Sequence, residues 1–297
     1  MAPARRSVLR KTVRPLSLSK GAIPMAHLFS YGTLILVTLL ISLPVIWLVI
    51  TSLKQETEYL AWPITILPEV AQWDNYVKVF TMGGFSYFNV AANTFFLATT
   101  NTILTLITSS MAGFAFSRFD VPGRDKLFMI VIALLIVPPI VTIIPQFIVF
   151  ARLHLTNTYW PWILWGLTAS PLHIFLFRQF FASFPRELED AAEVDGCGPF
   201  RTFWQIFLPN AKPALATSFI FNFGAVWGDY FNPRIFLTDA QTTLAVKLSR
   251  AYADPVGNRF VTVTLAASVV YLLPLVVLFF LGQRHILEGV VTSGLRR

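Results

Sequence analysis

The stretch FPRELEDAAEVDGCGPFRTFWQIFLPNAKP, residues 184–213, decides the fold, because it is charged and helix-prone and lies between long apolar runs. Five carboxylates crowd its first half, in a chain whose formal net charge is +8: Glu187, Glu189, Asp190, Glu193 and Asp195. Pro185 and the acids of the first turn suit a helix start, and Gly196 can adopt the left-handed conformation that ends a helix. The apolar residues between them share one face: Leu188, Ala191 and Ala192. We therefore expect a short acidic helix that ends near Gly196.

A second short helix is predicted over Phe200–Leu208. Its aromatic side chains recur at i, i+3, i+4 and i+7: Phe200, Phe203, Trp204 and Phe207. Pro209 and Pro213 mark the exit from this helix. Most charged loops are solvated and carry no function, but a flexible loop would lack these helix starts and stops, and an aromatic stripe needs a covering surface. We therefore expect the acidic segment (residues 184–213) to be a rigid docking element, packed on membrane helices or on a partner.

Composition excludes a soluble globule of this size. Hydrophobic residues make up 55% of the 297 residues and charged residues 13%, and the mean hydropathy is +0.64. Too few polar side chains remain to solvate a folded surface, so we expect a multi-pass protein in a lipid membrane. The positive charge then reflects Lys and Arg held on the cytoplasmic side, and nucleic acid is not expected as a partner. The single cysteine, Cys197, excludes an internal disulfide, and no spacing typical of a metal site occurs.

Apolar runs long enough to cross a bilayer predict an all-α protein with six transmembrane helices. They are Leu28–Thr51, Phe88–Ala112, Leu127–Phe150, Trp160–Phe177, Ala214–Asn232 and Phe260–Leu281. The third run contains Pro138, Pro139 and Pro145, and such breaks survive in a bilayer where protein or a water-filled cavity satisfies the freed carbonyls. The predicted organisation is a basic N-terminus (1–27), a transmembrane domain (28–282) and a tail (283–297). Residues 52–86 are turn-rich and predict an ordered segment at the outer interface.

The distribution of basic residues predicts the orientation. Sixteen Lys and Arg residues fall on the side that carries both termini and the acidic segment, against seven on the other side. Because cytoplasmic loops carry the excess of positive charge, both termini and the acidic segment are expected in the cytoplasm.

No enzyme is expected, because the sequence lacks a phosphate-binding G-x-x-x-x-G-K-[ST] loop and an H-E-x-x-H metal pair. Uphill transport would then take its energy from an ion gradient or from another subunit. Asp229 near the end of the fifth run either faces a cavity or caps its neighbours at the interface. Asn89, Asn93 and Asn101 either line a polar path or form bonds between helices, and we expect the bonds. The candidate residues for a translocation path are Asn89, Asn93, Pro138, Trp227, Asp229 and Asn232.

A family resemblance follows from the acidic segment. The run Glu187–Gly196, followed by Phe203, Ile206 and Leu208–Pro209, resembles the EAA loop of ABC importer permeases, E-A-A-x-x-D-G and then I-x-L-P. The likeness extends to the carbohydrate-uptake branch. Supporting stretches are Ser52–Lys54, Ser117–Phe119, Pro122–Arg124, Val137–Pro138, Asn157–Tyr159, Arg178–Phe181 and Trp227–Asp229. The resemblance implies a type I permease fold in a bacterial inner membrane, importing mono- to oligosaccharides by alternating access.

The resemblance also implies partners. They are a second, different permease subunit, two copies of a cytoplasmic ABC ATPase and an extracytoplasmic sugar-binding protein, with ATP and Mg²⁺ bound by the ATPase and no cofactor on this chain. By position, the residues that couple to the ATPase are Glu187, Glu189, Asp190, Ala191, Ala192, Asp195, Gly196 and Phe200. Asp190 stands where the family usually has Glu, and Cys197–Pro199 replaces the usual Ala-Ser stretch. Three alternatives stay open: an ABC permease for a glycerophosphodiester, polyamine or peptide, a stand-alone ion-coupled carrier or channel, and a membrane scaffold.

Overall fold

Helices make up most of the part of the chain that the structure describes. The computed structural model describes residues 25–82, 84–250, 252–253 and 256–294, with side chains over 27–284 of these ranges. Within this part every regular element is a helix, and a single isolated bridge joins Ala253 to Arg259. The predicted all-α fold is therefore confirmed. Most of the predicted basic N-terminus, residues 1–24, lies outside the described residues.

The chain divides into two compact units, residues 1–47 and 48–297, and helix α1 crosses from one into the other. The helices in the first half of the chain are α1 (Met25–Ser52), α2 (Glu56–Leu60), α3 (Asp74–Thr81), α4 (Tyr87–Arg118), α5 (Arg124–Ala133), the 3₁₀ helix η1 (Leu134–Ile136) and α6 (Pro139–Arg152). Those in the second half are α7 (Trp160–Leu167), α8 (Pro171–Ala182), α9 (Glu187–Val194), α10 (Pro199–Thr202), the π-helix η2 (Phe203–Phe207), α11 (Leu208–Asn210), α12 (Lys212–Trp227), α13 (Phe231–Phe236), α14 (Leu244–Leu248) and α15 (Val261–Gly294).

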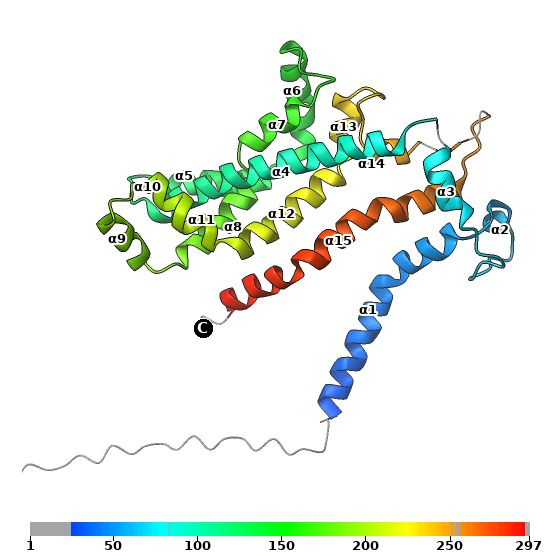
Figure 1. Ribbon diagram of the computed structural model, residues 1–297, viewed down its shortest axis with the longest axis horizontal. Helices are drawn as coiled ribbons and strands as arrows, with labels where there is room; N and C mark the ends of the chain where they lie inside the picture. Colours follow the sequence, from blue (N-terminus) through cyan, green and yellow to red (C-terminus); the bar gives the residue numbers. More distant parts are fainter. Residues whose placement is uncertain (1–24, 83, 251, 254–255, 295–297) are drawn as a thin grey trace, which may run out of the picture. The chain divides into compact units, whose positions relative to one another are not determined.

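Helix α4 lies at the centre of the second unit, where α7, α8 and α12 pack against it (Figure 1). Two glycines allow this close packing. A Cβ atom at Gly166 of α7 would lie 2.8 Å from the Leu104 Cβ atom of α4. The corresponding atom at Gly113 of α4 would lie 2.6 Å from the Phe177 Cβ atom of α8. Small residues at these crossings bring the backbones together, as is typical of helix pairs in membranes.

Polar side chains also join the helices around α4. The Asn101 Nδ2 atom donates to the Trp162 carbonyl oxygen at 2.8 Å. From α12, the Asn222 Nδ2 atom donates to the Asn101 Oδ1 atom at 3.1 Å and to the Thr102 Oγ1 atom at 3.0 Å. Asn101 therefore bonds between helices, which confirms the expected role for this asparagine.

Three helices of the described chain are long and apolar enough to cross a membrane, by length and composition: His27–Ser52, Tyr87–Arg118 and Val261–Arg284. The count rises to four if the bent pair Arg124–Ile136 and Pro139–Arg152, with an angle of 97°, forms one span. The break expected in the third run thus falls between η1 and α6, at Val137 and Pro138. Pro145, by contrast, lies inside α6 without ending it.

Two predicted spans differ from the structure. The prediction of one span over Trp160–Phe177 is wrong, because the helix is interrupted between α7 and α8. Pro171 has no N–H group to continue the helix, and it becomes the first residue of α8. The Ser170 N–H group at the break donates to the Ser109 hydroxyl of α4 at 2.9 Å. The fifth predicted span is also too long, since α12 ends at Trp227 and covers about 24 Å at 1.5 Å per residue.

The described residues 52–82 and 84–86 form an ordered segment, as predicted. The Glu56 carboxylate accepts hydrogen bonds from the Val261 N–H group at 2.9 Å and from the Thr262 N–H group at 3.0 Å. An acid at this place caps the start of α15 and complements the helix dipole. Nearby, the buried Asn75 side chain donates to the carbonyl oxygens of Ser52 and Lys54, each at 2.9 Å. This segment therefore fixes where α15 begins.

Candidate functional site

The first helix of the acidic segment forms and ends as predicted. Helix α9 covers Glu187–Val194, and Gly196 has a φ of +72°. The Cys197 N–H group donates to the Ala192 carbonyl oxygen at 2.8 Å, and the Gly196 N–H group donates to Glu193 at 3.0 Å. These bonds satisfy carbonyls at the helix end, and they require the left-handed conformation that glycine adopts most easily.

The second helix of the acidic segment is also present, but its middle part is a π-helix. It begins as α10, continues as the π-helix η2 and ends as α11. Phe203 and Phe207, four residues apart within η2, are both buried on the inner face. Phe200 is instead 66% exposed. The predicted aromatic stripe is thus divided into an inner pair and two exposed rings, those of Phe200 and Trp204.

The inner pair is held by the ends of two membrane helices. The Phe207 ring centroid lies 4.8 Å from that of Phe114 in α4 and 5.7 Å from that of Phe181 in α8. The Phe203 centroid lies 5.4 Å from that of Phe114. The two Phe207 pairs are edge-to-face, and such pairs are favourable beyond the apolar area that they bury. The second helix is therefore fixed to the body of the protein.

Helix α9 presents different faces to the protein and to the outside. Of its residues, Ala192 is buried, and Glu189, one turn earlier, is 31% exposed. The outward face is acidic with small or apolar residues between, and Val194 is 88% exposed. Its exposed members from the predicted coupling set are Glu187, Asp190 and Ala191, followed by Asp195 and Gly196. Of the predicted apolar seam, Leu188 and Ala191 are exposed, so Ala192 alone packs inward.

Sequence reasoning missed Arg118, the last residue of α4, which holds the inner face of α9. Its Nη1 atom lies 2.9 Å from the Glu189 Oε1 atom, and its side chain is 6% exposed. The guanidinium also lies over the Phe207 ring, 4.9 Å from the centroid. The available signal was a basic residue at the end of an apolar run, which served to predict orientation and, within Ser117–Phe119, to support the family resemblance.

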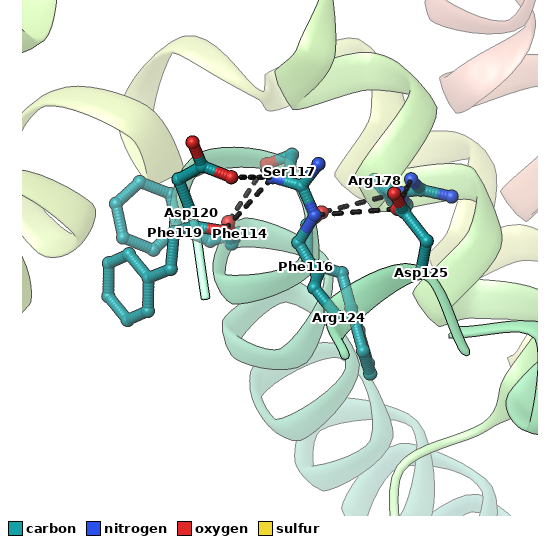
Figure 2. Close-up of polar contacts among 8 residues, drawn as sticks. All are labelled: Phe114, Phe116, Ser117, Phe119, Asp120, Arg124, Asp125 and Arg178. Carbon is teal, nitrogen blue, oxygen red and sulfur yellow. Dashed lines mark hydrogen bonds and ion pairs between the residues drawn. The ribbon is translucent and has the colours of Figure 1, made fainter. Parts of the chain in front are cut away.

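A second basic cluster surrounds the turn after α4 (Figure 2). The Arg178 Nη2 atom of α8 lies 3.1 Å from the Asp125 Oδ1 atom at the start of α5, and the Arg124 Nε atom lies 3.4 Å from the same oxygen. Arg124 also donates to the Phe119 carbonyl oxygen at 3.0 Å. Asp125 therefore joins the start of α5 to α8.

Most of the residues predicted for a translocation path form hydrogen bonds with other residues of this chain. At the end of α12, the Asp229 carboxylate accepts from the Asn232 N–H group at 3.2 Å and from the Asn232 side chain at 2.7 Å. This is the capping arrangement, one of the two possibilities for Asp229. Trp227 is buried and donates to the Tyr271 carbonyl oxygen at 3.2 Å.

The other path candidates lie on α4 and at the helix break. The Asn93 side chain donates to the Thr242 carbonyl oxygen at 3.4 Å, which joins α4 to the residues before α14. Asn89 is exposed in the first turn of α4, where its N–H group donates to the Ser86 cap at 3.4 Å. Pro138 is exposed between η1 and α6.

An all-helical, multi-pass membrane protein with an acidic helix–turn–helix fixed to the ends of its membrane helices has the architecture of a transport permease. Residues 105–290 match the family described as binding-protein-dependent transport system inner membrane component. The chain belongs to this family.

Relatives and a solved structure agree with this assignment. The chain is 33% identical over 264 residues to the arabinooligosaccharides transport system permease protein AraQ of Bacillus subtilis, covering 88% of this chain and 92% of the relative. It is 30% identical over 267 residues to the diacetylchitobiose uptake system permease protein NgcG of Streptomyces coelicolor, covering 89% and 87%. A chain from the crystal structure of a bacterial ABC transporter involved in alginate import superimposes with a TM-score of 0.75 at 21% identity, covering 90% of this chain and 99% of that one. The predicted permease fold is confirmed.

Proposed function

We propose that this chain is the permease subunit of an ATP-driven, binding-protein-dependent importer of sugars, from mono- to oligosaccharides. Family membership supports the transport role, and the relatives named for arabinooligosaccharide and diacetylchitobiose uptake support the substrate class. The observation that carries the coupling role is the division of α9 into an anchored inner face and an exposed acidic face.

The exposed face of the acidic segment is the proposed contact for a separate ATPase subunit. Carboxylates at Glu187, Asp190 and Asp195 can pair with basic groups on the walls of a cleft. Ala191 and Gly196 permit a close approach, and Phe200 supplies an exposed aromatic contact. Ala192, expected in the same contact, is buried against this chain and instead holds α9 in place. Glu189 lies on the inner face of α9, where it pairs with Arg118 of this chain.

The rest of the assembly follows from this contact. The permease would pair with a second, different permease subunit, two ATPase copies and an extracytoplasmic binding protein. ATP and Mg²⁺ are bound by the ATPase, and this chain needs no cofactor. Both termini and the acidic segment lie in the cytoplasm of a bacterial cell. Alternating access requires two states of the helices that the partners stabilise to different extents.

For the translocation path, the break at Pro138 is the best-supported element. An exposed proline at a 97° bend leaves backbone carbonyls without intrahelical partners, and inside a bilayer such groups need a cavity or a neighbouring protein. Asn89 and Asn93 on α4 are assigned to the same path. Trp227, Asp229 and Asn232 shape the end of α12 and act on the path through that helix.

Purification and reconstitution test the proposal. The complex isolated through a tag on this chain is expected to contain an ABC ATPase, and proteoliposomes loaded with ATP are expected to take up sugar when binding protein is supplied outside. A thermal-shift screen of the binding protein would identify the sugar. Uptake that follows an ion gradient and ignores ATP would contradict the proposal and favour a lone carrier. A binding protein stabilised by polyamines or peptides, but by no sugar, would contradict the substrate class.

A further inference from the structure

Helices α4 and α8 end side by side, and each carries an arginine that binds carbonyl groups near the end of the other. Arg118 of α4 donates through its Nη2 atom to the carbonyl oxygens of Phe181 and Phe184, the latter at 2.7 Å. Arg178 of α8 donates through its Nε atom to the Phe116 carbonyl oxygen at 3.3 Å. The last carbonyls of a helix lack intrahelical donors and carry the negative end of its dipole, so each guanidinium stabilises the neighbouring helix end. We call these reciprocal contacts the arginine exchange.

Each arginine of the exchange also makes an ion pair with a further element. Arg118 pairs with Glu189 of α9, and Arg178 pairs with Asp125 at the start of α5 (Figure 2). Helix α9 belongs to the acidic segment, and α5 is the first half of the bent pair. Four elements are thereby joined in the order α9, α4, α8 and α5.

The Arg118 end of this chain of contacts is the more rigid one. Its side chain is 6% exposed, and it is held by two carbonyl oxygens, one carboxylate and the Phe207 ring at once. A buried guanidinium that loses a partner cannot replace that partner with water, so these contacts hold its position tightly. Arg178 is 24% exposed, and its partner Asp125 is 69% exposed.

Helix α9 depends on this arginine more than the second helix does. The second helix is fixed by the buried Phe203 and Phe207 rings, whereas Ala192 is the residue of α9 that is buried. Apolar contact is non-directional, so one alanine leaves α9 able to roll about its axis. The ion pair of Glu189 with the buried Arg118 side chain gives α9 a second fixed point, one turn from Ala192, and it therefore sets which face of α9 points outward.

We propose that Arg118 is a positioning residue for energy coupling, which holds α9 through Glu189 and passes a displacement of α9 to the ends of α4 and α8. This inference rests on the proposed function, because it takes the ATPase as the source of the displacement. Without the ion pair, the ATPase still binds the exposed face of α9 and hydrolyses ATP, but the membrane helices follow less of its motion. The signature is ATP hydrolysis without matching sugar uptake.

The test compares two isosteric substitutions on the same helix in the complete reconstituted importer. Glu189→Gln removes the charge that faces Arg118 and leaves the two carbonyl bonds of Arg118 in place. Glu193→Gln removes one negative charge from the exposed part of α9, outside the predicted coupling set, and controls for net charge. The measured quantities are the amount of ATPase that co-purifies, the rate of ATP hydrolysis, sugar molecules taken up per ATP, and the thermal unfolding temperature.

We expect Glu189→Gln to retain the ATPase and to hydrolyse ATP within about twofold of the wild-type rate, while uptake per ATP falls at least fivefold. Glu193→Gln should match wild type, and Glu189→Asp should recover part of the lost uptake. Unchanged uptake per ATP in Glu189→Gln would overturn the inference alone, as would loss of the ATPase or a parallel fall in unfolding temperature and all activities. Absence of ATP-dependent uptake in the wild-type importer would instead overturn the proposed function, and this inference with it.

Discussion

Gly113 of α4 lies so close to Phe177 of α8 that a Cβ atom at position 113 would come within 2.6 Å of the Phe177 Cβ atom and 2.9 Å of the Arg178 backbone nitrogen. This crossing lies just before the ends of both helices. It brings Arg118 and Arg178 within reach of the opposite helix, so the arginine exchange depends on a glycine one and a half turns away.

Gly113→Ala is therefore expected to destabilise the protein by about 2 kcal/mol, because the backbones at the crossing must separate to admit a methyl group. Unfolding of the detergent-solubilised protein by heat or denaturant measures the change. Gly32→Ala is the control, since a Cβ atom there meets no other atom within 4 Å. Equal stability of the two variants would contradict the close crossing.

Phe207→Ala should destabilise the protein by about 3 kcal/mol, since it empties the aromatic cluster between the second helix, α4 and α8. The exposed Phe200 gives a matched comparison. Phe200→Ala is expected to leave the unfolding transition nearly unchanged but to weaken ATPase co-purification, because this ring belongs to the proposed docking face. If Phe200→Ala lowered stability as much as Phe207→Ala, the assignment of inner and outer rings would be wrong.

Gly196→Trp and Asp195→Lys should each uncouple ATP hydrolysis from uptake while the membrane helices stay intact. At Gly196 the φ of +72° strains any other residue, and the bulky ring would also block the close approach of the ATPase. Asp195→Lys reverses a charge on the docking face. Circular dichroism of the purified permease and uptake in proteoliposomes distinguish folding from coupling. Normal transport by a well-expressed Gly196→Trp subunit would refute the role of this turn.

A double-mutant cycle can isolate the contact between Arg118 and Glu189. Arg118→Lys keeps the charge but loses the planar fork that serves two carbonyls and a carboxylate. We expect each single variant to lower uptake per ATP and the double variant to be no worse than the more severe of the two, since both remove the same contact. If the fold-losses of uptake per ATP in the two single variants multiplied in the double variant, Arg118 and Glu189 would have independent roles.

Much of the acidic segment could be predicted from sequence because its signals are local. Pro185, the cluster of acids and Gly196 define one helix without information from the rest of the chain, and the structure agrees. The spacing of aromatic residues likewise predicted the second helix. It did not predict that part of this helix is a π-helix, or that Phe203 and Phe207 are buried while Phe200 is exposed.

The faces of α9 could not be predicted, because they depend on a residue far away in sequence. Hydrophobicity alone would bury Leu188 and expose Glu189, but Leu188 is exposed and Glu189 lies against the protein. The reason is Arg118, whose side chain meets Glu189 where the ends of α4 and α8 pack together. The break between α7 and α8 was missed for a different reason, because the apolar run continues across it. Pro171, the first residue of α8, was the available signal.

Photo-cross-linking from the exposed face of α9 tests the central claim most directly. A benzoylphenylalanine placed at Val194, which is 88% exposed, should cross-link to the ATPase subunit in the assembled importer. The same probe at Trp160, at the start of α7 on the predicted outer side, should not reach the ATPase. A cross-link to the ATPase from position 194 alone is the result that the account predicts. No such cross-link from position 194, or a cross-link to the ATPase from position 160, would contradict it.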